Sequence, residues 1–176
     1  MSGHAWAMMV RALLAAAGLA LSLGACEVQL GDSPSVQPTA SPPPTKSGEI
    51  SVPVKVVVKH ANTVVVVPVK VAGKGPYDFV LDTGASMSAL DKVLVRKLRL
   101  RKTGENAQVT GVTGSSLLPL VRVPSWSVGG QALTGRELPM IDLGGDYAGL
   151  LGSDELRRFG AVRIDFRAAR LVLKDR

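Results

Sequence analysis

Valine is concentrated in two short segments, and this concentration constrains the fold more than any other feature. Val54 and residues 56–58 form one run, and residues 64–67 form another. β-Branched side chains pack best on a pleated, half-buried surface, and aromatic residues make up only 4% of the chain. Residues 50–59 and 63–71 are therefore predicted strands of a hairpin, reversed at His60-Ala61-Asn62. The folded part is expected to be rich in β-structure.

The first 25 residues differ from the rest and are set aside from the fold. Arg11 precedes a mostly apolar, uncharged run at 12–23, and the segment closes on Leu23-Gly24-Ala25-Cys26. Such a run is shorter than the roughly 20 residues that a transmembrane helix needs. The plan is typical of a signal peptide, so residues 1–25 predict export.

Cys26 is the only cysteine of the chain, which excludes an internal disulfide. The segment Leu23-Gly24-Ala25-Cys26 resembles the bacterial lipobox, in which an apolar residue and two small residues precede a lipidated cysteine. That resemblance implies a lipid anchor on the periplasmic or extracellular face of a membrane. It also explains an odd thiol in an oxidising compartment. The alternative is an ordinary secretory signal with a fortuitous cysteine.

Residues 26–48 have the composition of a linker. Five prolines lie among serine, threonine, glutamine and glycine, at positions 34, 38, 42, 43 and 44. Small polar residues bury little surface, and proline favours extended conformations, so this segment is expected to act as a spacer. The functional domain is then 49–176. With 46% hydrophobic and 20% charged residues overall, the chain has enough apolar material for one core.

The net charge of +7 belongs to the predicted domain. Residues 1–48 carry Arg11 and Lys46 against Glu27 and Asp32, which sum to zero. The basic residues of 49–176 are scattered, without the interleaved aromatic residues that stack on bases, so no nucleic-acid partner is expected. Attraction to an anionic membrane surface and a merely solvated cationic surface both remain open.

The remaining pattern predicts a mainly β domain with two short helices. A third strand is expected at 77–81, two more within 107–128 around a glycine-bearing tip, and a closing hairpin of 161–166 with 171–174. Short helices are expected at 91–100 and 154–159. No repeat of 20 to 50 residues is present, which excludes a solenoid. Six to nine short strands predict a small β-barrel-like domain.

An acidic residue ends the third predicted strand, where the segment reads Phe79-Val80-Leu81-Asp82-Thr83-Gly84-Ala85-Ser86. The apolar strand delivers the carboxylate to its end, and the glycine permits a tight turn that aims amide donors at the acid. A catalytic carboxylate needs to be held in this way, at the end of a strand and within reach of amide donors. The triplet Asp82-Thr83-Gly84 alone also suits an ordinary turn, so the context decides.

Downstream, an apolar pair precedes a glycine and a predicted helix, in Ala148-Gly149-Leu150-Leu151-Gly152-Ser153-Asp154. With the loop at 82–86 and a candidate flap at Gly111, Val112, Thr113 and Gly114, this order resembles the retropepsin-like aspartic proteases, especially their bacterial branch. The resemblance covers nearly all of 50–176. It implies a small closed acid-protease β-barrel, in which Leu150, Leu151 and Gly152 lead into a helix beneath the active-site loop.

The resemblance implies an aspartic endopeptidase that acts on polypeptides without a metal or cofactor. Two adjacent carboxylates share one proton; one deprotonates a water while the other binds or protonates the scissile carbonyl. The chain has one such triplet, because Asp142-Leu143-Gly144 lacks the hydroxyl and Asp32-Ser33-Pro34 lacks the glycine. The second acid is therefore expected from a second chain, in a homodimer that places Asp82 opposite its own copy. By resemblance, Thr83 braces the two loops and Gly84 offers its amide to the carboxylate.

Two departures from the family pattern concern the flap and the dimer. The flap tip has no aromatic residue, and Ser153 stands where retroviral members have an arginine. The dimer-stabilising ion pair of those members is thus not carried over, although Arg157 and Arg158 are near in sequence. A long N-terminal addition also replaces the interleaved terminal strands of many retroviral dimers.

Other candidate sites are weaker. A histidine metal site or a Ser-His-Asp triad would rest on His60 alone, because the only other histidine, His4, lies in the signal segment. Asp142 and Asp146 flank two glycines, as a cation site or as simple turn formers. The functional alternative is a catalytically inactive retropepsin-fold binding domain tethered at the cell envelope. The intact Asp82, Thr83 and Gly84 favour the enzyme.

Overall fold

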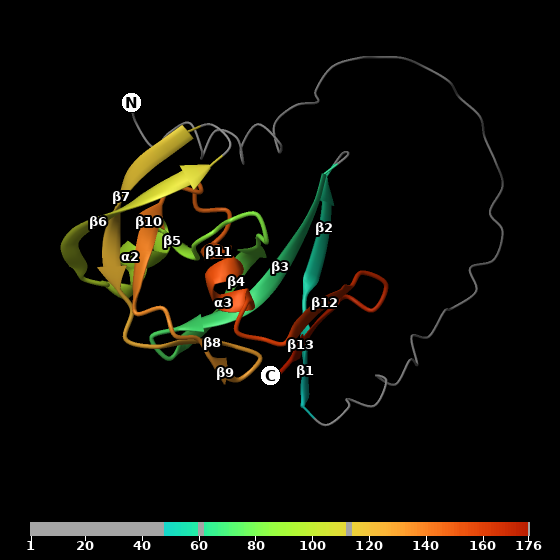
Figure 1. The fold of residues 1–176 in the computed structure, drawn as a ribbon. Coiled ribbons are helices and arrows are strands. Elements are labelled where there is room, and N and C mark those ends of the chain that lie inside the picture. Colours follow the sequence, from blue (N-terminus) through green and yellow to red (C-terminus); the bar gives the residue numbers. More distant parts are fainter. Residues whose placement is uncertain (1–47, 60–61, 112–113, 176) are drawn as a thin grey trace, which may run out of the picture.

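The computed structural model of the chain describes residues 48–59, 62–111 and 114–175. In these ranges, thirteen strands form two sheets, accompanied by two short helices (Figure 1). The strands are β1 (Glu49–Pro53), β2 (Lys55–Lys59), β3 (Asn62–Val71), β4 (Lys74–Leu81), β5 (Ala89–Asp91), β6 (Lys102–Gly111), β7 (Gly114–Arg122), β8 (Trp126–Val128), β9 (Gln131–Ala132), β10 (Glu137–Ile141), β11 (Gly149–Leu151), β12 (Ala161–Asp165) and β13 (Arg170–Lys174). The helices are α2 (Lys92–Leu98) and α3 (Ser153–Leu156). The predicted fold class, mainly β with two short helices, is confirmed.

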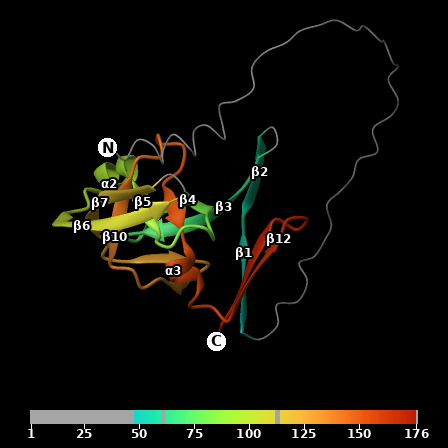
Figure 2. The ribbon, with the colours of Figure 1, turned by 45° about the horizontal axis from the view of Figure 1, so that its top comes forward.

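The two valine runs pair as an antiparallel hairpin, β2 with β3, as predicted. The prediction of one strand over 50–59 is wrong, because the chain changes sheet at Val54. β1 pairs with β13 in a three-stranded sheet, whereas β2 joins the larger sheet. The Val54 amide donates to the carbonyl of Ala169 at 3.0 Å, which satisfies the backbone at the crossing. Figures 1 and 2 both show the sheet β1-β13-β12 on the side of the molecule opposite the hairpin β6–β7.

The centre of the larger sheet brings distant segments together. β4 pairs with β3 antiparallel and with β11 parallel, in the register Phe79↔Gly149, Val80↔Leu150 and Leu81↔Leu151. β5 pairs with the other edge of β11, and β10 pairs with β5. The order runs from β6 to β9, and closure of the predicted barrel is not among the pairings described.

Strand alternation divides the apolar side chains between two faces of this sheet. Phe79 and Leu151 pack into the main core, whereas Val80 and Leu150 pack into a smaller cluster on the opposite face. Gly149 permits the close approach of β11, because a Cβ there would lie 2.3 Å from the carbonyl oxygen of Ala89 and 2.5 Å from Cε1 of Phe79.

Both helices are shorter than predicted. α2 begins after Asp91, whose Oδ1 accepts from the Val93 amide at 2.7 Å and whose Oδ2 accepts from the Leu143 amide at 2.7 Å. This fully buried carboxylate therefore caps the helix and fixes the loop after β10. α3 is a single turn, and its first residue, Ser153, is hydrogen-bonded to the loop that follows β4.

Candidate active site

The Asp82 carboxylate lies at the end of β4, where the parallel neighbour β11 fixes its backbone. The Asp82 amide donates to the carbonyl of Leu151 at 3.0 Å. The chain then turns, and the amides of Gly84 and Ala85 donate to Oδ1 of Asp82 at 2.9 and 3.1 Å. A Cβ on Gly84 would stand 3.3 Å from that oxygen, so glycine leaves the carboxylate room. These two hydrogen bonds hold the half-buried Asp82 carboxylate in one orientation.

Asp82 opens onto a cleft of about 460 Å³ with apolar walls. The other lining residues come from β3, β4 and the turn after β12: Thr63, Val64, Val65, Val80, Leu81 and Phe166. Phe166 is 56% exposed. Sequence reasoning did not assign this aromatic residue to the site, because 84 positions separate it from Asp82 and no local pattern joins them.

The first residue of α3 is bonded to the active-site loop. The Ser153 amide donates to the carbonyl of Ala85 at 2.9 Å, and its hydroxyl donates to the carbonyl of Thr83 at 2.7 Å. Ser153 therefore gives two hydrogen bonds within its own chain at the position where retroviral members have arginine. The side chain of Thr83 remains exposed.

A buried serine links the same loop to the apolar-apolar-glycine segment. The amide and hydroxyl of Ser88 donate to Oδ1 of Asp154 at 2.9 and 2.7 Å, while its hydroxyl accepts from the Gly152 amide at 2.9 Å. Ser88 has no exposed surface. A Cβ on Gly152 would lie 2.8 Å from the backbone carbon of Met87, so only glycine fits. Sequence reasoning missed Ser88, whose partners lie 64 and 66 residues away.

The other predicted site residues occupy varied environments. Ala85 is buried and Ser86 is exposed. Leu150 and Leu151 are both buried, on opposite faces of the sheet beside Asp82. At the candidate flap, Gly111 pairs with Gly114 where β6 ends and β7 begins, and Val112 and Thr113 lie outside the described residues. Cys26 and His60 lie outside them as well.

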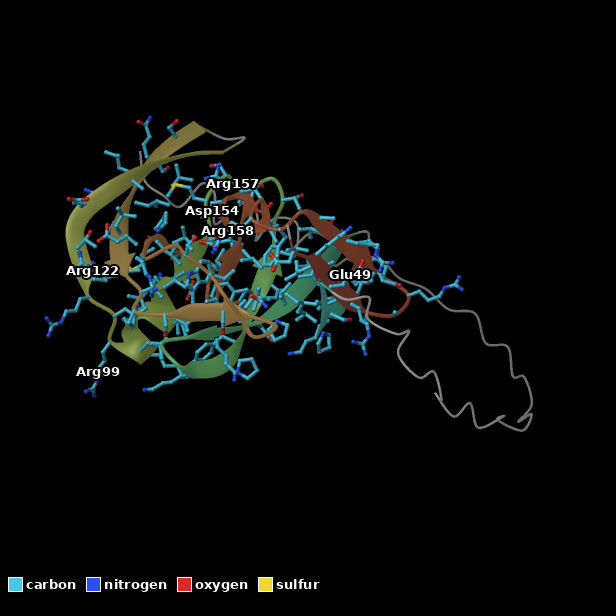
Figure 3. All side chains as sticks on the ribbon, turned by 60° about the horizontal axis from the view of Figure 1, so that its bottom comes forward. Glu49, Arg99, Arg122, Asp154, Arg157 and Arg158 are labelled. Carbon is cyan, nitrogen blue, oxygen red and sulfur yellow. The ribbon has the colours of Figure 1, made fainter. Side chains whose placement is uncertain are left out.

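At the candidate cation site, Asp142 makes an ion pair and a hydrogen bond within a turn. Asp142 accepts from the Lys92 ammonium group through Oδ2 and from the Gly144 amide through Oδ1 at 3.0 Å. No group of three histidine, cysteine, aspartate or glutamate residues that could bind a metal ion occurs in the described ranges. Figure 3 shows Arg99 and Arg122 far from Arg157 and Arg158 at α3, so these cations form no single patch.

One tyrosine in the loop before β11 has a perturbed acidity. Burial raises the pKa of Tyr147, and the negative charges of Asp146 and Asp78 raise it further. The phenol therefore stays protonated at neutral pH, as a hydrogen-bond donor rather than an acid-base group.

Comparison with known proteins gives one family match. A model described as aspartyl protease matches residues 67–154, which are 88 of the 176 residues and thus half of the chain. No curated protein sequence matches. Similar solved structures include a retropepsin-like aspartic protease from Rickettsia conorii, at 24% identity and a TM-score of 0.49, covering 73% of this chain and 90% of that one. Another is the simian foamy virus (mac) protease, at 13% identity and a TM-score of 0.38, covering 52% of this chain and 91% of that one.

The buried serine supplies a first prediction. Ser88→Ala removes a donor to Asp154 and leaves the Gly152 amide without its acceptor, so the free energy of unfolding should fall by about 1–3 kcal/mol. Ser86→Ala, an exposed serine in the same loop, is the matched control and should change it by less than about 0.5 kcal/mol. Urea unfolding of the full chain measures both. Equal costs for the two variants would contradict the role given to Ser88.

Proposed function

We propose that this chain, which belongs to the aspartyl protease family, is an aspartic endopeptidase with Asp82 as its catalytic residue. One observation carries the proposal: the Asp82 carboxylate accepts from two backbone amides and lines an apolar cleft. An acid in this position can act on a bound peptide, and the apolar walls suit apolar side chains beside the scissile bond.

The reaction requires a second carboxylate. One carboxylate takes a proton from water while the water oxygen attacks the scissile carbonyl carbon, and the protonated partner gives its proton to the carbonyl oxygen. Collapse of this intermediate returns a proton to the amide nitrogen and breaks the carbon–nitrogen bond. The acids Asp91, Asp154 and Glu155, of which Asp91 and Glu155 are buried, each accept hydrogen bonds from donors of their own chain. The second acid is therefore Asp82 of the partner subunit in a homodimer.

The exposed edge of β12 suits the second copy. Among the described strands, β12 pairs with β13 alone, so its other edge can accept a strand. In a two-fold antiparallel pairing centred on Ile164, Arg163 stands opposite Asp165 of the partner subunit, and Val162 stands opposite Phe166 of the partner subunit. This register joins opposite charges and covers an exposed aromatic ring beside the cleft.

The dimer surface can be tested by charge reversal. Arg163→Glu would place two acids opposite each other twice in this pairing, so the dimer dissociation constant should rise at least about tenfold. Arg101→Glu, an exposed arginine just before β6 and on the opposite side of the molecule, is the matched control and should leave it near the wild-type value. Sedimentation of the full chain over a concentration series measures both. An unchanged dimer in Arg163→Glu would exclude this register.

Catalysis by Asp82 is tested with an unfolded protein substrate between about pH 3 and pH 8. Asp82→Asn keeps the size of the side chain but removes the acid, so cleavage should fall by about a thousandfold or more. Asp146→Asn, an exposed acid in the loop before β11, should cleave like the wild type. If the wild type is folded and dimeric yet cleaves nothing at any pH, the tethered binding domain becomes the better account.

We also propose that the protein is exported and anchored through a lipidated Cys26, with residues 26–48 as the spacer. None of the helices in the described part of the chain is long and apolar enough to cross a membrane. Two or more acyl chains would anchor the domain stably, where one binds only marginally.

The anchor makes a separate prediction. Cys26→Ser removes the acceptor thiol, so the protein should no longer incorporate a labelled fatty acid in a bacterial host. Ser22→Ala, in the same leader, should still incorporate it. Immunoprecipitation of the labelled protein measures both. Labelling of Cys26→Ser at the wild-type level would rule out lipid anchoring at this residue.

A further inference from the structure

A second carboxylate in α3 is buried away from the cleft and has its own set of donors. Glu155 is 2% exposed. The Thr134 amide lies 3.1 and 3.0 Å from its two oxygens, and the Gly135 amide lies 2.6 Å from Oε1. The Thr134 hydroxyl and the Arg158 guanidinium add contacts at 3.3 Å each. These donors offset the cost of burying a charge, so Glu155 ties α3 firmly to residues 134–135.

The segment that Glu155 binds is bonded to the base of the flap hairpin β6–β7. The carbonyl of Arg136, the next residue, accepts from the amide of Val123 at 2.7 Å, directly after β7. The Arg136 guanidinium donates to the carbonyl of Pro124. β10 then starts at Glu137 and pairs with β7 in the register Leu138↔Val121. Movement of residues 134–136 therefore displaces the strand that carries one side of the flap.

Gly135 is fitted to this carboxylate. A Cβ on Gly135 would lie 2.9 Å from Cδ2 of Leu138, 3.2 Å from Oε1 of Glu155 and 3.5 Å from the ring of Trp126. The close approach that gives the 2.6 Å hydrogen bond thus requires glycine. The contact therefore depends on the carboxylate of Glu155 and on the absence of a side chain at Gly135.

We infer that Glu155 is a positioning residue that couples the active-site loop to the base of the flap. On one side of α3, Ser153 and Asp154 bind the loop that carries Asp82. On the other side, the adjacent Glu155 binds the segment that leads into β10. The helix is a single turn, so neither contact shifts without the other. The kinetic consequence of this coupling rests on the proposed function, whereas the coupling itself does not.

The chemistry of the contact explains why a carboxylate is needed. An ionised glutamate only accepts hydrogen bonds, and here two amides, a hydroxyl and a guanidinium all donate to it. Glutamine has the same size but offers one acceptor oxygen and turns an amino group toward the other donors. Glu155→Gln therefore disrupts the contact with little change in volume.

Hydrogen exchange of the full chain tests the coupling at residue level. In Glu155→Gln, the amides of Thr134 and Gly135 should exchange at least about tenfold faster, and those of Val123, Gly84 and Ala85 should accelerate with them. Amides of the sheet β1-β13-β12 should keep their wild-type rates. Glu137→Gln, which loses only a surface ion pair with Arg122, is the matched control and should change none of these amides. Gly135→Ala attacks the same contact from the other side and should reproduce the pattern.

Two exchange results would overturn the inference. Acceleration confined to Thr134 and Gly135 would show that the contact is local, and an even acceleration over the whole chain would show that Glu155 only stabilises the fold. For peptide cleavage, the expected change in Glu155→Gln is a fall of about tenfold in kcat with KM within about twofold of wild type. Unchanged kcat would overturn the kinetic consequence. Absence of cleavage in the wild type would instead refute the proposed function, and the exchange rates would still decide the coupling.

Discussion

The site depends on the parallel pairing of β4 with β11. This pairing joins residues 79–81 to 149–151, and at its end the carbonyl of Leu151 accepts from the Asp82 amide. Parallel neighbouring strands need a long connection between them. Here residues 82–148 form that connection, and they lead from the end of β4 back to the start of β11 beside it. The active-site loop and α3 consequently emerge side by side from adjacent strands. The position of the carboxylate is thus fixed by the centre of the sheet.

Hydrogen bonds around α3 hold the loop that carries Asp82. Ser88, Gly152 and Asp154 satisfy one another beneath the loop, and Ser153 binds the loop from its outer side. Ser88 is fully buried, and an unpaired buried donor or acceptor loses its bonds to water. Breaking its bonds to Asp154 and Gly152 is therefore costly. Glu155, in the same helix, accepts from the amides of Thr134 and Gly135, in the segment before β10.

Local sequence patterns predicted the features that depend on neighbours in the chain. The two valine runs predicted the hairpin β2–β3, and the apolar run before Asp82 predicted β4 and its loop. The division of 50–59 at Val54 was missed because valine stands at every second position from 52 to 58, through the change of sheet. Ser88 and Glu155 were missed because their partners lie 64–66 and 20–21 residues away. Sequence patterns report which face a side chain takes, but contacts of this range follow from the topology.

The central claim is that catalysis needs an Asp82 from each of two chains, and subunit mixing tests it most directly. Wild-type chain is mixed with an equal amount of Asp82→Asn, dissociated and allowed to reassociate at constant total concentration, and peptide cleavage is measured. Random pairing leaves about one quarter of the dimers with two acids, so activity should fall to about a quarter of that of wild-type chain at the same total concentration. Activity of about one half would mean that each chain acts with its own acid alone, which would contradict the account.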